Sequence, residues 1–264
     1  MILCGVFKMK IVVLNFRRFL IYLLVYITTV LIISAVSIKG MEALGVFSGN
    51  RETPIYSVDA VKKVASITFD CAWGADDMAE ILTTLKQADI KATFFIVGQW
   101  AEKYPETVKM IAQDGHDIAN HSYSHLRMGT LDRPKISSEI ELCSDVLKQL
   151  SGVKCDLFRA PYGDYNNSLI NEARIQGYYT IQWDVDSLDW KPGISKGEIL
   201  QRIKTKIKPG SIILFHNDTP HTSKLLPEII SELESKGYEF IPVSKLIIRD
   251  NYYIDEEGCQ KNNT

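Results

Sequence analysis

Residues 64–98 read VASITFDCAWGADDMAEILTTLKQADIKATFFIVG, a short apolar run, an amphipathic stretch and a second apolar run. Apolar runs of this length that are rich in β-branched and aromatic residues predict buried strands. The stretch between them has the periodicity of a helix with one apolar face. Strand, helix and strand in this order form the repeating unit of a parallel α/β sheet, and the same alternation continues to about residue 250.

The full alternation predicts seven strands, which end at Asp70, Gly98, His121, Pro161, Asp186, Asn217 and Ser244. Several of the helical patterns between them stop before a glycine that suits a left-handed cap, namely Gly115, Gly152, Gly177 and Gly237. The sheet is expected to be largely parallel, either closed as a (β/α) barrel or open and doubly wound. No GxGxxG motif or P-loop follows the first strand, which argues against a nucleotide cofactor.

The composition indicates one main domain. The chain has 264 residues, of which 46% are hydrophobic and 23% charged, so one sizeable core is expected. The charges of its 30 basic and 32 acidic residues nearly cancel, so the chain lacks the net positive charge typical of nucleic-acid-binding proteins. The five cysteines show no CxxC pair and no regular spacing, so a disulfide framework is not predicted.

The N-terminal region contains an uncharged segment, FLIYLLVYITTVLIISAVSI, at residues 19–38. As a helix it would rise about 30 Å, the thickness of a bilayer core. By the positive-inside rule, the basic residues before it place the N-terminus in the cytoplasm and the rest of the chain outside, these residues being Lys8, Lys10, Arg17 and Arg18. Its length favours an uncleaved anchor in the cell membrane. Cleavage at the small residues Ser34, Ala35 and Ser37 would instead make the protein secreted.

The predicted organisation has five parts. These are a cytoplasmic N-terminus (1–18), a transmembrane anchor or signal segment (19–38), a connector (39–61), the α/β domain (62–250) and a polar C-terminal tail (251–264).

Polar side chains occur at or just after the ends of several predicted strands: Asp70, His121, Arg159, Asp184, Asp186 and His216. Because the carboxyl ends of parallel strands meet at one edge of a sheet, these residues are expected to converge there. Ligand-binding and catalytic groups of parallel α/β folds lie at this edge. The sequence therefore predicts a functional site that combines carboxylates, imidazoles and a guanidinium.

The HSYSH segment places two histidines, His121 and His125, four residues apart. If the segment turns helical after the strand, this spacing brings the two imidazoles together. Paired imidazoles suit a divalent metal ion. An HxxxH pair alone has only moderate specificity, but the end of a predicted strand is a favourable position for a ligand.

Five motifs occur in order along the predicted domain: SITFD (66–70), HSYSH (121–125), RAPYG (159–163), DVDSLDW (184–190) and ILFHN (213–217). This ordered set resembles the polysaccharide deacetylases of carbohydrate esterase family 4, which share the NodB homology domain. The resemblance spans residues 62–247. It implies a distorted (β/α) barrel of about seven parallel strands, preceded in this chain by the N-terminal transmembrane helix.

The resemblance also implies a divalent metal, often zinc, that polarises the acetamide carbonyl and its attacking water. His121 and His125 match the two histidine ligands of the family. Asp70 matches the general base, and Arg159 matches the residue that keeps this base ionised and oriented.

The remaining matches concern the leaving group and the substrate. His216 matches the general acid that protonates the leaving amine, and Asp189 matches the carboxylate that raises the pKa of this acid. Tyr162 matches the position whose backbone N–H binds the tetrahedral oxyanion. Trp190 and Leu214 match the apolar wall that receives the acetyl methyl group.

One residue departs from the family pattern. The family has a metal-binding aspartate directly after the base, whereas this chain has Cys71, in FDCAWGADD. Asp77 or Asp76 is expected to supply the missing carboxylate, and Asp77 is preferred. Alternatively, Cys71 binds the metal as a thiolate, which would favour zinc, or metal binding is weak or absent. The FDxxWG form resembles a subgroup of sporulation-associated deacetylases in which the second aspartate is likewise missing.

The predicted function is removal of N-acetyl groups from a cell-envelope polysaccharide, with N-acetylglucosamine or N-acetylmuramic acid of peptidoglycan as the first substrates to consider. The alternative is a weak or inactive homologue that binds carbohydrate. A complete set of base, arginine, acid and carboxylate favours the enzyme, since binding alone does not require it. A glycosidase would need two carboxylates across a sugar bond and gives the paired histidines no role.

Overall fold

The computed structural model describes residues 20–30, 52–154 and 156–263, and the chain divides into two units, 1–50 and 51–264. In the first unit, residues 20–30 form a helix. Within the parts of the chain that the structure describes, no helix is both long enough and apolar enough to cross a bilayer. The rest of the predicted span, residues 19 and 31–38, lies outside the described residues, as does the predicted cytoplasmic segment 1–18. The anchor stays a prediction.

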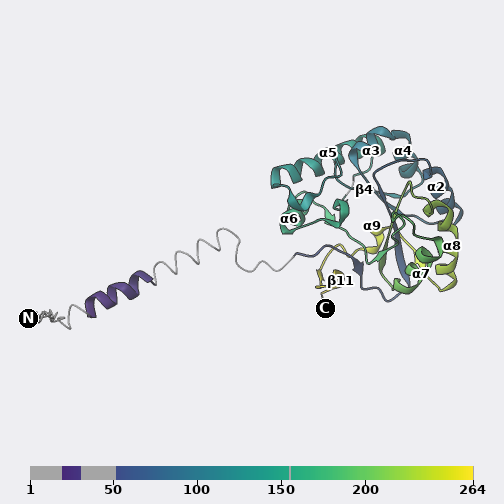
Figure 1. The fold of residues 1–264 in the computed structure, drawn as a ribbon. Coiled ribbons are helices and arrows are strands. Elements are labelled where there is room, and N and C mark those ends of the chain that lie inside the picture. The colour runs from purple at the N-terminus through teal and green to yellow at the C-terminus, as the bar shows by residue number, and fades with distance from the viewer. Residues whose placement is uncertain (1–19, 31–51, 155, 264) are drawn as a thin grey trace, which may run out of the picture. The chain divides into compact units, whose positions relative to one another are not determined.

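The second unit has a curled sheet with helices around its outside (Figure 1). Its main order is β10-β11-β1-β8-β2-β3-β4-β5-β6, while β7 pairs with β8 and β9 pairs with β2. The bounds are β1 (Ser57–Val58), β2 (Val64–Cys71), β3 (Thr93–Ile96), β4 (Asp117–Asn120), β5 (Leu157–Phe158), β6 (Tyr179–Thr180), β7 (Val185–Asp186), β8 (Ser211–His216), β9 (Glu239–Phe240), β10 (Tyr252–Ile254) and β11 (Cys259–Asn262). All pairings within β2–β9 are parallel.

The predicted α/β alternation is confirmed. Each of the seven predicted strands is present, and the segment predicted to end at Asp186 is divided into β6 and β7. A parallel bridge between Ile55 and Ile181 joins the end of β6 to the segment before β1, which gives the curled sheet its barrel-like form.

The helices are α2 (Met78–Gln87), α3 (Gly98–Lys103), α4 (Pro105–Gln113), α5 (Arg133–Ser151), α6 (Asn167–Ile175), α7 (Lys196–Lys206), α8 (Thr222–Ser235) and α9 (Val243–Leu246), with 3₁₀ turns η1 (Met128–Thr130) and η2 (Pro161–Gly163). The four glycines predicted as left-handed caps all have positive φ angles. Gly152, for example, follows α5 at φ 71° and donates its backbone N–H to Lys148 O.

The C-terminal segment differs from the prediction. Residues 251–264 were expected to form a polar tail, but they contain β10 and β11, and β11 pairs with β1 from the predicted connector. These strands are two to four residues long and lack an apolar run, so the periodicity of the sequence does not reveal them.

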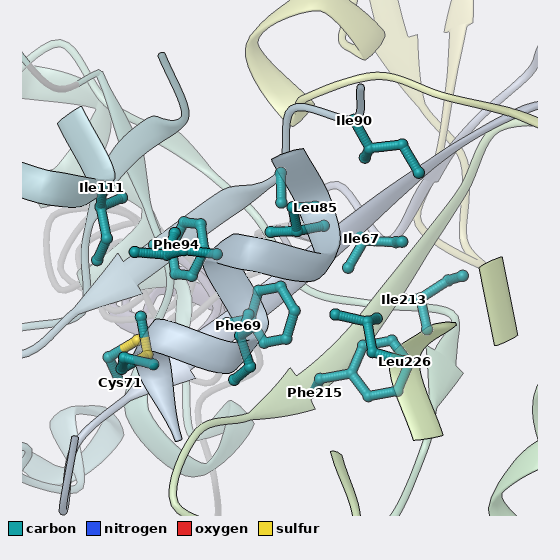
Figure 2. Close-up of a cluster of buried hydrophobic side chains, with 14 of the residues drawn as sticks. Ile67, Phe69, Cys71, Leu85, Ile90, Phe94, Ile111, Ile213, Phe215 and Leu226 are labelled. Carbon is teal, nitrogen blue, oxygen red and sulfur yellow. The ribbon is translucent and has the colours of Figure 1, made fainter. Parts of the chain in front are cut away.

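Side chains of the central strands alternate between two environments. Phe69 and Cys71 of β2 belong to an apolar core with residues of the surrounding helices, such as Leu85 of α2 and Leu226 of α8 (Figure 2). Thr68 and Asp70, on the opposite face of the strand, point inward. This alternation determines which motif residues can reach the inside of the curled sheet.

Candidate active site

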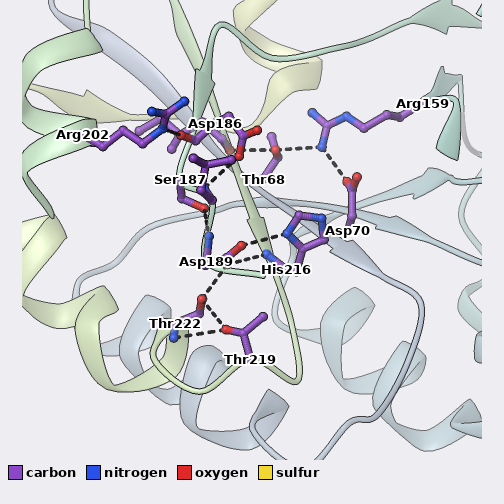
Figure 3. A network of polar contacts seen from close by, with 12 residues as sticks. Thr68, Asp70, Arg159, Asp186, Ser187, Asp189, Arg202, His216, Thr219 and Thr222 are labelled. Atoms are coloured by element: carbon purple, nitrogen blue, oxygen red, sulfur yellow. Dashed lines mark hydrogen bonds and ion pairs between the residues drawn. The ribbon is translucent and has the colours of Figure 1, made fainter. Parts of the chain in front are cut away.

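The predicted base lies at the end of β2 in a buried ion pair. Arg159 follows β5 and is fully buried, and its Nη1 is 2.6 Å from Asp70 Oδ1 (Figure 3). The guanidinium also donates to Thr68 Oγ1 at 3.0 Å and to the backbone oxygen of Gln182 at 3.1 Å, and it stacks on the Phe95 ring at 3.8 Å. Arg159 is therefore held by contacts from several parts of the sheet.

The electrostatics around Asp70 favour its ionised form. Burial by itself raises the pKa of this carboxyl, but the charges of Arg159, His121 and His216 outweigh burial, and the pKa lies below its ordinary value. Asp70 is therefore an anion at neutral pH, as a general base must be.

The two histidines of HSYSH come together, but not on a helix. Residues 121–127 form a loop in which Ser122 and His125 adopt left-handed conformations, at φ 64° and 56°. The ring centroids of His121 and His125 are 5.2 Å apart. Ser122 Oγ accepts the His125 N–H, and the fully buried Glu139 of α5 accepts the Ser124 N–H at 2.7 Å. The proximity was predicted correctly, whereas the helical reason for it was wrong.

Both imidazoles are suited to be neutral ligands. His121 Nδ1 lies 2.9 Å from Arg159 O, and His125 Nδ1 lies 3.1 Å from the Tyr162 hydroxyl. Burial lowers the pKa of both rings, that of His125 to about 4. The Nε2 atom of His121 faces Asp70, 3.4 Å from its Oδ2. Two imidazole nitrogens of this kind suit a divalent metal.

Among the residues that the structure describes, no third ligand joins the predicted metal site. Within residues 20–30, 52–154 and 156–263, no group of three or more His, Cys, Asp or Glu side chains is arranged to hold a metal ion. Cys71 packs in the apolar core and does not line the cavity that contains the histidines, so it is not placed to bind a metal beside them. Burial also raises the pKa of its thiol well above the ordinary value. The donor set therefore falls short of the three protein ligands usual for catalytic zinc.

The two aspartates expected to replace this ligand lie elsewhere. Asp77 Oδ1 accepts the backbone N–H of Asp218 at 2.9 Å, and Asp77 does not line the cavity that contains the histidines. Asp76 is exposed and does not line this cavity either. Neither carboxylate is placed with the histidine pair as the sequence predicted.

The predicted acid is paired with its predicted carboxylate. His216 Nδ1 is 2.8 Å from Asp189 Oδ1, and the His216 backbone N–H donates to Oδ2 of the same carboxylate (Figure 3). Burial would lower the pKa of His216, but the hydrogen bond and charge of Asp189 outweigh burial and raise it. His216 is thus disposed to carry a proton. Thr222, which sequence reasoning missed, also donates to Asp189 at 2.6 Å.

The predicted base and the predicted acid are neighbours in the sheet. Asp70 and His216 are register partners on the adjacent parallel strands β2 and β8, so their side chains emerge on the same face. Both line a cavity of about 770 Å³, which also includes the predicted substrate-binding residues Tyr162, Trp190 and Leu214.

Other expected residues divide between the cavity and the rest of the domain. Asp186 lines the cavity, whereas Asp184 accepts hydrogen bonds from Ser211 and Ile212 at the start of β8 and does not line it. The cavity also contains residues that the motifs did not indicate, namely Trp73, Arg127 and Trp183.

The comparisons with known proteins agree with this geometry. The polysaccharide deacetylase family model matches residues 57–181. A peptidoglycan-N-acetylglucosamine deacetylase of Bacillus cereus is 35% identical over 190 residues, which cover 70% of this chain and 68% of that protein. The uncharacterized protein YlxY of Bacillus subtilis is 35% identical over 196 residues, and the match covers 74% of this chain but only 60% of YlxY.

Among solved structures, BA3943 of Bacillus anthracis, a CE4 family pseudoenzyme, has a TM-score of 0.71 at 32% identity, covering 75% of this chain and 70% of BA3943. A mutant of that pseudoenzyme with restored enzymatic activity matches equally well, at 34% identity. The fold, the pairing of the predicted site residues and the 35% identity to a known deacetylase converge on one conclusion. This chain belongs to the polysaccharide deacetylases of carbohydrate esterase family 4, defined by the NodB homology domain.

Proposed function

We propose that the protein removes N-acetyl groups from a cell-envelope polysaccharide, with the N-acetylglucosamine or N-acetylmuramic acid units of peptidoglycan as its substrate. The observation that carries the proposal is the opposite tuning of two neighbouring groups. The pKa of Asp70 is lowered by its charged neighbours, and the pKa of His216 is raised by Asp189. One cavity therefore combines a carboxylate whose anionic form is favoured with an imidazole whose protonated form is favoured, the pair that acid–base catalysis of amide hydrolysis uses.

In this reaction Asp70 accepts a proton from the attacking water, and Arg159 keeps the carboxylate ionised and fixed. The backbone N–H of Tyr162, in a left-handed turn at φ 61°, is assigned to the oxyanion of the tetrahedral intermediate. His216 then protonates the leaving amine, which makes the sugar nitrogen a good leaving group.

The acetyl methyl group is assigned to the apolar side of the cavity. Leu214 is buried there, and Trp190 is half exposed at the same cavity. An apolar pocket of this kind favours a short acyl group over a charged one.

The proposal includes a divalent metal ion, preferably zinc, for which this chain supplies two protein ligands. His121 and His125 would hold it, and a bound ion would supply Lewis-acid polarisation of the acetamide carbonyl. Because the third protein ligand is missing from the described residues, we expect weak metal affinity. None of the steps assigned above to Asp70, Arg159 and His216 is routed through the ion.

The decisive experiment measures acetate release from peptidoglycan and from chitooligosaccharides, with and without added zinc and with a chelator. Release by the wild type and its loss in His216→Asn would support the proposal. His221→Asn is the matched control, because His221 follows the same strand and binds the Ile194 backbone oxygen outside the cavity. Absence of acetate from every N-acetylated glycan, with or without zinc, would refute the enzymatic proposal.

A second candidate is a carbohydrate-binding homologue with little or no catalysis. The missing third ligand favours it, as does the structural similarity to the pseudoenzyme BA3943. Glycan binding without acetate release in the same experiment would select this candidate.

We also propose that residues 19–38 anchor the protein in the cell membrane with the deacetylase domain outside, or are cleaved to release it. The uncharged run and the preceding basic residues support this orientation. Protease treatment of intact cells, with N-terminal sequencing of the recovered protein, tests both forms. A domain that stays protected until the cells are lysed would contradict the outward location.

A further inference from the structure

Trp73 is an exposed tryptophan at the catalytic cavity that none of the assigned steps uses. It lies in the loop after β2, and 52% of its surface is exposed. Its ring meets His125 edge-on, with centroids 5.8 Å apart, and lies tilted against His216 at 6.1 Å. The indole therefore stands between the histidine pair and the acid, at the opening of the cavity.

The segment that follows this indole is fixed to the loop after β8. The Gly74 N–H donates to Asp218 Oδ2 at 3.0 Å, and the Asp218 N–H donates in return to Asp77 Oδ1 at 2.9 Å. Asp77, expected from the sequence to bind a metal, thus holds the Trp73 loop instead.

Two further donors bind the carbonyl oxygen of the same glycine. Trp100 Nε1 donates to the Gly74 oxygen at 2.9 Å, and the Asn217 side-chain amide donates to that oxygen as well. A Cβ atom at position 74 would lie 2.4 Å from the Asp218 carboxylate, so only glycine allows this approach. Three of these contacts are made by the backbone of Gly74 and one by the side chain of Asp77, and none requires the indole of Trp73.

Hydrogen bonds therefore fix the loop backbone that carries this large apolar ring, while the ring itself stays half exposed. A half-exposed indole contributes little hydrophobic stabilisation to the fold. On a loop whose backbone is already ordered, it offers a surface to a ligand with a small loss of loop entropy on binding. The Tyr162 ring also contacts His125, with ring centroids 4.6 Å apart, and the Arg127 guanidinium lies over the Tyr162 ring at 4.7 Å. Trp73 and Tyr162 thus both contact His125, and both line the cavity.

We propose that Trp73 is a substrate-binding residue on which the pyranose ring of the acetylated sugar stacks. The axial C–H groups of a β-linked pyranose present a flat apolar face, which complements the π-face of an indole. This inference rests on the proposed function for the identity of the sugar, because it assigns a binding surface for the same substrate.

The test measures binding of chitotetraose by isothermal titration calorimetry to the full chain in detergent, on a His216→Asn background that prevents turnover. Trp73→Ala should weaken binding about tenfold, and Trp73→Phe should retain most of it, since the smaller ring still stacks. Tyr253→Ala is the matched control: Tyr253 is an aromatic residue of similar exposure, 47%, on β10 outside the cavity, and its loss should leave binding unchanged.

Unchanged affinity in Trp73→Ala would overturn the inference, as would equal losses in Trp73→Ala and Tyr253→Ala. Equal losses in Trp73→Ala and Trp73→Phe would also overturn it, because stacking tolerates a phenyl ring. Acetate release is measured separately without the His216 substitution. Trp73-dependent binding without any acetate release would leave the inference standing while the proposed catalysis fails.

Discussion

Replacement of Arg159 by methionine should reveal how much the buried ion pair with Asp70 contributes to the free energy of unfolding. Methionine preserves much of the side-chain length and the contact with Phe95, but it removes the charge and the donors to Asp70 and Gln182. Asp70, 4% exposed, would be left as an unpaired buried carboxylate. Removing one partner of such a pair costs about 3–5 kcal/mol, a large part of the about 5–15 kcal/mol that stabilises a typical domain.

Urea unfolding followed by tryptophan fluorescence measures this loss, and a double-mutant cycle identifies its cause. Asp70→Asn alone leaves the guanidinium unpaired and should also destabilise the protein. Because each single variant leaves one buried charge and the double variant leaves none, the double variant should recover about 2–3 kcal/mol relative to the sum of the single losses. Additive losses, within about 0.5 kcal/mol, would refute the claim that the two side chains form one electrostatic unit.

The pH dependence provides a second check. In the folded wild type the pKa of Asp70 is lowered, so ionised Asp70 adds to the free energy of unfolding at pH values above the pKa of the unfolded chain, about 3.9. This stabilisation is lost as the pH falls through the folded pKa. Without Arg159, burial is less opposed and the pKa should rise. A raised folded pKa penalises the ionised form, so the stability deficit of Arg159→Met should grow from pH 4 to pH 8. A constant deficit would contradict this explanation.

Three further predictions concern single residues. Asp189→Asn should lower the pKa of His216, because burial then acts without the carboxylate, and the alkaline limb of the pH–rate profile should move to lower pH. Protonated His216 stabilises the wild-type fold until the pH rises through the raised folded pKa, and in the variant this stabilisation should be lost at lower pH. Cys71→Ala should cost about 1–2 kcal/mol in urea unfolding, whereas Cys71→Asp, which buries a carboxylate, should cost about 3 kcal/mol or more. Gly210→Ala should cost about 3 kcal/mol or more by the same measurement, because its Cβ would lie 1.7 Å from Val58 O at a φ of 80°.

Much of the site could be predicted because it follows from strand periodicity. Asp70 and His216 end apolar runs, and the ends of parallel strands meet, so their convergence needed no knowledge of the loops. The same reasoning could not separate Asp184 from Asp186. The structure does so through side-chain contacts, which direct Asp184 to the start of β8 and leave Asp186 at the cavity.

The loops were harder to predict because their geometry depends on long-range contacts. The pairing of His121 and His125 depends on left-handed residues and on Glu139, which lies fourteen residues beyond His125 on another element. The role of Asp77 depends on Asp218, which lies 141 residues further along the chain. Neither partnership leaves a local pattern in the sequence.

The direction of the Cys71 side chain follows from the length of β2. Side chains alternate along a strand, so two consecutive residues of one strand cannot both face the inside of the sheet. Asp70 occupies the inward position, and β2 continues through Cys71, which therefore packs outward against the helices. In the conformation of this chain a carboxylate at position 71 would point into the apolar core, so joining His121 and His125 would require a change of the backbone at the end of β2. The missing metal ligand is thus a matter of backbone conformation as well as of residue type, and restoring the aspartate by itself should destabilise the core before it builds a metal site.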